Sequence, residues 1–70
     1  MTVKKVQTAA ACRGIYFSGD RDGIWYNCFI PWELGGGHMQ ADTLQGMYKL
    51  IMQRKKIFRT EAEHWESDIL

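Results

Sequence analysis

The chain has 70 residues, of which 46% are hydrophobic and 24% are charged, and its formal net charge is +1. These values exclude a disordered tail, which has fewer apolar residues, and a membrane span, which needs an uninterrupted apolar run. A domain of this length buries only about 60% of the surface of its unfolded chain. We therefore expect one small, soluble, cytoplasmic module that gains stability from self-association or from a partner.

The beginning of the chain fits two kinds of secondary structure. Val3, Val6 and Ala10 lie at helical spacing, and three consecutive alanines favour a helix. The same residues also fit a first strand that continues into a hairpin. We predict the strand, so that residues 3–31 form the sheet part of the chain.

Two segments rich in β-branched and aromatic residues, 9–17 and 24–30, flank a polar stretch, 19–23, that holds two glycines and two aspartates. This pattern predicts a β-hairpin. In the register that we expect, three pairs lie opposite each other: Tyr16 and Ile24, Gly14 and Tyr26, and Cys12 and Cys28. The segment before Cys12 is too short and too weakly apolar for a signal peptide, so we expect both cysteines to be free thiols.

Alternation along the second hairpin strand gives it two apolar faces. One face carries Trp25, Asn27 and Phe29, and the other carries Ile24, Tyr26, Cys28 and Ile30. A single helix cannot cover both faces. Because aromatic and arginine side chains dominate protein-binding hot spots, we predict that a partner protein contacts Arg21, Trp25, Tyr26, Phe29 and Trp32.

The second half of the chain predicts helices. Pro31 ends the hairpin, and residues 35–40 form a glycine-rich hinge before a helical part at about 42–70. Asp42 and Gln45 match a capping box for a helix over residues 43–58, and a second box at Thr60 begins a short C-terminal helix. The first helix carries an apolar stripe for the sheet, made of Leu44, Met47, Tyr48, Ile51 and Phe58.

A second stripe on the same predicted helix recurs at spacings of four, three and four residues. Its members are Gly46, Leu50, Gln53 and Ile57. The ordinary interpretation is a wide buried face. The alternative, which we adopt as a prediction, is a helix-to-helix contact between two copies of the chain in a homodimer.

Charge is segregated in this half of the chain. Residues 43–60 carry five basic side chains and no acid, whereas the residues that follow carry four acids. This basic segment and the aromatic hairpin suggest an alternative function, nucleic-acid binding. It would use Arg13, Lys49, Arg54, Lys56 and Arg59. The low net charge argues against this alternative, because nucleic-acid domains have a clear basic excess.

Motifs for catalysis, metals and cofactors are not apparent. The two cysteines and two histidines lack the paired spacing of a zinc site, and Phe29 stands where a calcium loop needs its bidentate glutamate. Gly35, Gly36 and Gly37 lack the lysine of a phosphate-binding loop. We therefore expect no metal, no cofactor and no enzymatic activity.

The sequence as a whole predicts an α+β fold, with a hairpin or three-stranded antiparallel sheet packed on one amphipathic helix and a short C-terminal helix. The predicted function is that of a small inhibitor or adaptor that binds and blocks a larger protein. Stand-alone proteins of this size with dense aromatic surfaces are common among bacteriophage accessory proteins, which suggests a viral origin and a host protein as the target.

Overall fold

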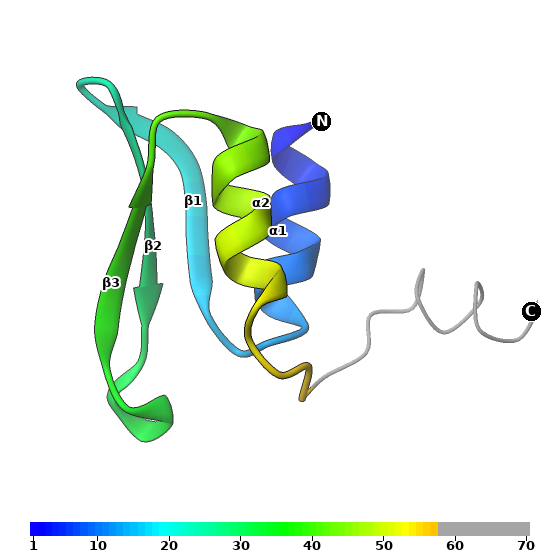
Figure 1. The fold of residues 1–70 in the computed structure, drawn as a ribbon. Coiled ribbons are helices and arrows are strands. Elements are labelled where there is room, and N and C mark those ends of the chain that lie inside the picture. Colours follow the sequence, from blue (N-terminus) through cyan, green and yellow to red (C-terminus); the bar gives the residue numbers. More distant parts are fainter. Residues whose placement is uncertain (58–70) are drawn as a thin grey trace, which may run out of the picture.

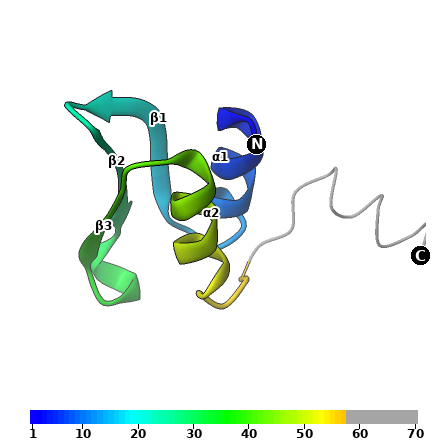
Figure 2. The same cartoon turned by 45° about the horizontal axis from the view of Figure 1, so that its top comes forward.

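The computed structural model describes residues 1–57 (Figure 1). Three strands form one antiparallel sheet in the order β1-β2-β3. Both helices lie on the same face of this sheet (Figures 1 and 2). In chain order the elements are α1 (Val3–Ala11), β1 (Tyr16–Asp22), β2 (Trp25–Ile30), the 3-10 helix η1 (Trp32–Leu34), β3 (Gly37–Ala41) and α2 (Leu44–Met52). The predicted α+β class with a small antiparallel sheet is confirmed.

The N-terminal segment is a helix, so the predicted strand at residues 3–12 is wrong. Thr2 caps α1 by accepting a hydrogen bond from the backbone N–H of Lys5 at 3.2 Å. Val6 and Ala10 are fully buried at the helical spacing of four residues. The alanines favoured this helix locally, and packing on the sheet stabilises the stripe that they form.

The hairpin exists, but its predicted register is wrong. Asp22 pairs with Trp25, so the turn is shorter and later than the stretch 19–23, and Gly23 (φ 66°) occupies its left-handed position. Tyr16 consequently lies opposite Phe29 and not opposite Ile24. The predicted pairing of the two cysteines is also wrong, because Cys12 lies at the end of α1. Both cysteines are buried thiols, and no disulfide joins them.

An irregularity in β1 explains why the register could not be obtained by counting. Phe17 pairs with Cys28 and Arg21 pairs with Tyr26, so β1 uses four steps where β2 uses two. The surplus residues form a bulge that contains Gly19 (φ 86°). On β2 the predicted alternation holds: Cys28 is buried, whereas Trp25 and Phe29 are exposed.

The third strand is β3, and it replaces most of the predicted hinge at residues 35–40. Gly35 and Gly36 form a tight turn after η1, in which the N–H of Gly36 donates to the carbonyl of Pro31 at 3.0 Å. Gly37 then pairs with Ile30 and begins the strand. The glycines therefore serve a defined turn and do not form a flexible connection.

α2 is shorter than the predicted helix over residues 43–58. Its N-cap is Thr43 and not Asp42, which the capping box predicted. The hydroxyl of Thr43 accepts a hydrogen bond from the N–H of Gly46 at 2.9 Å. The helix ends at Met52, so the chain after it does not extend the predicted apolar stripe. Met47 and Ile51 of that stripe are nonetheless fully buried. Phe58 and the C-terminal helix predicted from Thr60 lie outside the described residues.

The core lies between the helices and the inner face of the sheet. Its buried members come from both helices, from all three strands and from the residue just before β1: Val6, Ala9, Ala10, Ile15, Phe17, Cys28, Ala41, Met47 and Ile51. Lys5 of α1 also holds its ammonium 5.6 Å from the ring centre of Tyr48 on α2. The two helices and the sheet therefore share one core.

Arg13 is buried and joins the C-terminal ends of the two helices. Its Nη1 donates to the carbonyl of Ala9 at 2.9 Å, and its Nε donates to the carbonyl of Arg54 at 3.1 Å. Beside it, the N–H of Ile57 donates to the carbonyl of Cys12 at 2.9 Å. These bonds hold the segment after α2 against the end of α1.

Replacing Gly19 with alanine is expected to destabilise the fold. A Cβ at this position would overlap with Cγ1 of Val3. The positive φ of Gly19 adds a cost of about 1–2 kcal/mol for any residue with a Cβ. The matched control is Gly23→Ala, because Gly23 also has a positive φ but no atom within 4 Å of the added Cβ. Chemical denaturation should show the larger loss for Gly19→Ala, partly restored by Val3→Ala. Equal losses for the two glycine variants would contradict the close approach of α1 and β1.

Arg13→Met should lower the free energy of unfolding by about 2–4 kcal/mol, because it leaves two carbonyls without their donor. Arg13→Lys keeps the charge but cannot reach both carbonyls with a planar fork, so it should restore only part of the loss. Denaturant titration of the three proteins measures the effect. A loss below about 0.5 kcal/mol for Arg13→Met would show that the bridge is not structural.

Candidate functional site

The face of the sheet opposite the helices is the candidate site, and we call it the outer face. No helix of residues 1–57 covers it (Figures 1 and 2). The register places Tyr16 of β1, Phe29 of β2 and His38 of β3 in one row across the sheet. Asn27 and Gln40 form the next row. The outer face is thus a row of rings beside a row of amides.

The rings of this row are exposed and ordered relative to each other. Phe29 and His38 stack with their ring centres 4.8 Å apart and their planes at 14°. Tyr16 is 64% exposed and Phe29 is 50% exposed. Because these side chains stand on strands of a sheet, their spacing is set before any partner binds, which lowers the entropic cost of binding.

Asn27 connects the polar groups of the outer face. Its Oδ1 lies 2.7 Å from Nε2 of His38 and accepts a hydrogen bond from Nε2 of Gln40 at 3.1 Å. An amide oxygen only accepts, so Nε2 of His38 carries the hydrogen in this arrangement. The amide oxygen at the centre of the face is therefore satisfied within the chain.

The tip of the hairpin adjoins this face. Trp25 is 42% exposed. Arg21 lies over the ring of Tyr26 with its guanidinium carbon 5.2 Å from the ring centre, and its Nη2 donates to the carbonyl of Ile24. Tyr26 in turn packs on Phe17 of the core, at 6.0 Å between ring centres. Arg21 and Tyr26 are thus engaged with the chain itself.

The five residues predicted to bind a partner are therefore divided between surfaces. Trp25 and Phe29 lie on the outer face of the sheet. Arg21 and Tyr26 lie on the inner face, and Trp32 lies in η1. Trp32 is the most exposed large apolar residue described. Sequence reasoning missed Tyr16 and His38, because both join the row only in the observed register.

The residues predicted for self-association do not form one helical stripe. Leu50 packs against the core, Gln53 is the C-cap of α2, and Ile57 lies beyond the helix. Gly46 faces its own chain, since a Cβ there would lie 3.5 Å from Cβ of Ala41. The prediction of one continuous stripe is therefore wrong, because α2 ends at Met52. The homodimer remains a prediction, but this stripe no longer supports it.

The basic residues of the nucleic-acid alternative do not gather beside the exposed rings. Arg13 is buried in its bridge, Lys49 lies on α2 in the helical layer, and Arg54 and Lys56 follow α2. Arg59 lies outside the described residues. Neither β2 nor β3 contains a lysine or an arginine.

The thiol of Cys28 is buried, and its pKa is shifted. Burial raises this pKa from 9.0 to about 11, and the charge of Arg54 opposes the rise. Cys28 is therefore a neutral thiol at physiological pH, which argues against a role as a nucleophile.

Metal sites and membrane-spanning helices are absent from residues 1–57. These residues contain no group of three or more histidine, cysteine or acidic side chains that could hold a metal ion. None of their helices is long and apolar enough to cross a membrane.

A comparison of the chain with known proteins gives no match to a family model, to a curated protein or to a solved structure. The geometry of the outer face is therefore the basis for a functional assignment.

The raised pKa of Cys28 predicts a loss of stability at high pH. The unfolded chain ionises this thiol above pH 9, whereas the folded chain keeps it protonated until about pH 11. The contribution is therefore complete below pH 9 and falls by about 2–3 kcal/mol as the pH rises from 9 to 11. Denaturation of the wild type and of Cys28→Ala at pH 8, 9, 10 and 11 isolates the contribution of this thiol, since the other groups titrate equally in the two proteins. Parallel pH profiles would contradict the shift.

Proposed function

We propose that the chain is a small non-enzymatic interaction module of the cytoplasm that binds a larger protein through the outer face. As an inhibitor or adaptor it acts by occupying a surface that the larger protein needs for another contact. The observation that carries this proposal is the row of exposed rings, Tyr16, Phe29 and His38, across a sheet face that no helix of residues 1–57 covers.

The energetics of the outer face favour burial against a partner. Each aromatic side chain buries roughly 150–250 Å² when it is fully covered, and apolar burial contributes about 25 cal/mol per Å². The central oxygen of Asn27 already has its donors, so covering it leaves no unpaired acceptor. A partner therefore gains apolar contact without a large desolvation cost at the centre.

Charge favours a protein over a nucleic acid as this partner. Binding to nucleic acid depends on contacts between basic side chains and phosphates, and β2 and β3 contribute none. Lys4, Lys5 and Lys49 belong to the helices on the other side of the sheet. The stacked rings of Phe29 and His38 would accept a nucleobase, which keeps nucleic acid as the second candidate.

The test is capture of a partner by tagged wild-type protein from lysate, followed by affinity measurement with the purified partner. Phe29→Ala should weaken binding by tenfold or more, because central aromatic residues cost about 2 kcal/mol or more when they are truncated. Met52→Ala is the matched control, since Met52 is also exposed but lies on α2. Thermal unfolding should show that both variants remain folded.

Equal affinity of wild type and Phe29→Ala would contradict the assignment to the outer face. Single-stranded DNA and RNA are measured in the same series by fluorescence anisotropy. Binding that falls steeply with salt and is lost in Phe29→Ala would replace the protein partner with nucleic acid. Light scattering on the purified protein tests the predicted homodimer separately, and a monomeric mass would contradict it.

A further inference from the structure

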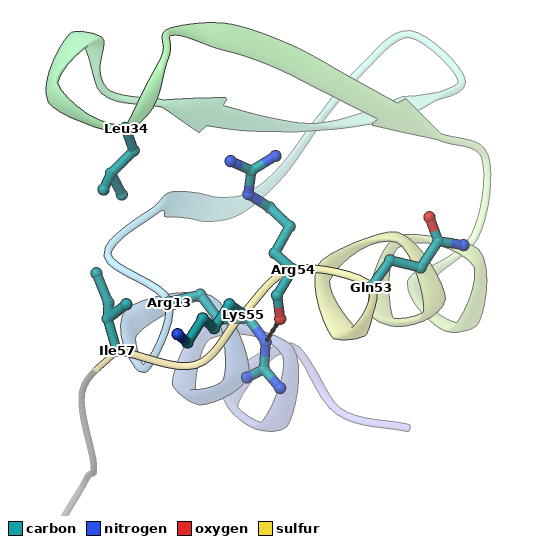
Figure 3. A pocket seen from close by; sticks show the side chains of 6 residues that line it. All are labelled: Arg13, Leu34, Gln53, Arg54, Lys55 and Ile57. Atoms are coloured by element: carbon teal, nitrogen blue, oxygen red, sulfur yellow. Dashed lines mark hydrogen bonds between the residues drawn. The ribbon is translucent and has the colours of Figure 1, made fainter.

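A pocket of about 260 Å³ lies between η1 and the segment that follows α2 (Figure 3). Six residues line it: Arg13, Leu34, Gln53, Arg54, Lys55 and Ile57. Three of these residues are basic and none is acidic. None of them belongs to the outer face, so the pocket is a separate feature of the molecule.

The basic side chains have different positions around the pocket. Arg54 extends towards the strands, and Lys55 extends towards Ile57 (Figure 3). The guanidinium of Arg13 lies on the other side of the backbone and donates from Nε to the carbonyl of Arg54 at 3.1 Å. Arg54 and Lys55 are therefore the groups that can contact a ligand, and Arg13 positions the backbone that carries them.

The acids of residues 1–57 do not neutralise this pocket. Asp20 and Asp22 are in the hairpin, Glu33 is in η1 and Asp42 precedes α2, and none of the four lines the pocket. The charge of Arg54 lowers the pKa of the Cys28 thiol, but burial raises it further, to about 11. The thiol therefore remains neutral and does not neutralise Arg54. Arg54 is half-buried, and none of the described residues that line the pocket with it carries a neutralising negative charge. This arrangement favours an anionic ligand.

We propose that this pocket binds a carboxylate group of a polypeptide side chain. The guanidinium of Arg54 matches a carboxylate with two parallel hydrogen bonds, and the ammonium of Lys55 adds a second positive charge. Leu34 and Ile57 form an apolar wall for the methylene groups that carry a side-chain carboxylate.

Two sources can supply this carboxylate. The first is the chain itself, because Ile57 lines the pocket and is followed in the sequence by Glu61, Glu63, Glu66 and Asp68. The second is an acidic side chain of another protein. Both present the same chemistry, and the experiment below separates them.

The probe is N-acetylglutamate α-amide, with N-acetylglutamine amide as its neutral control. It is titrated into the full chain at constant ionic strength, with the backbone amide signal of Ile57 in NMR spectra as the reporter. Saturable shifts with the acid and none with the amide are expected. The double variant Arg54→Gln with Lys55→Gln should weaken binding by about tenfold or more, because charged hydrogen bonds are lost.

Lys4→Gln with Lys5→Gln is the matched control, because it removes the same charge from α1 and should leave binding unchanged. A further variant neutralises the chain's own acids by Glu61→Gln, Glu63→Gln, Glu66→Gln and Asp68→Asn. If it binds the probe more tightly than the wild type, the chain's own carboxylates occupy the pocket. Equal binding of the probe by the wild type and by the variant with neutralised acids assigns the pocket to a carboxylate of another protein.

Two outcomes would overturn the proposal. One is the absence of saturable binding in both the wild type and the variant with neutralised acids. The other is equal weakening of binding by the Arg54 and Lys55 double variant and by the Lys4 and Lys5 control, which would show a general effect of net charge and no defined site.

Discussion

The buried guanidinium of Arg13 is the interaction on which the arrangement of the helices depends. The C-terminal ends of helices carry partial negative charge and unpaired carbonyls. Arg13 donates to the carbonyl of Ala9 in the last turns of α1 and to that of Arg54 just after α2, so one cation serves both ends. The bridge joins the two ends at the point where the chain leaves the helical path after Met52. The segment that follows this departure lines the pocket beside η1.

Placing both helices on one side of the sheet determines what the other side can do. The inner face supplies the core, which already uses Phe17, Cys28 and Met47. The outer face carries large apolar side chains, and residues 1–57 contain no further element that covers them. Its rings and amides are ordered by strand pairing and by the hydrogen bonds to Asn27. The proposed function thus uses the face of the three strands that does not contribute to the core.

Local patterns in the sequence predicted some of these features and not others. The faces of β2 and the buried positions Met47 and Ile51 followed from periodicity, which needs no knowledge of neighbours. The register of the hairpin did not, because the bulge before Arg21 adds residues that only the paired strands reveal. β3 has no β-branched residue and begins at a glycine, so its composition resembles a linker. For the site, Trp25 and Phe29 were predictable from alternation, whereas His38 required β3 to be known.

The bulge in β1 has a consequence for how the length of this strand can vary. Between Phe17 and Arg21 the strand advances two residues more than its partner, yet both residues occupy paired positions, opposite Cys28 and Tyr26. Directly paired residues point to the same face of a sheet, so Arg21 lies on the side of Tyr26 in spite of the surplus. The bulge can therefore take up a change in the length of β1 without moving the side chains of the hairpin tip to the other face.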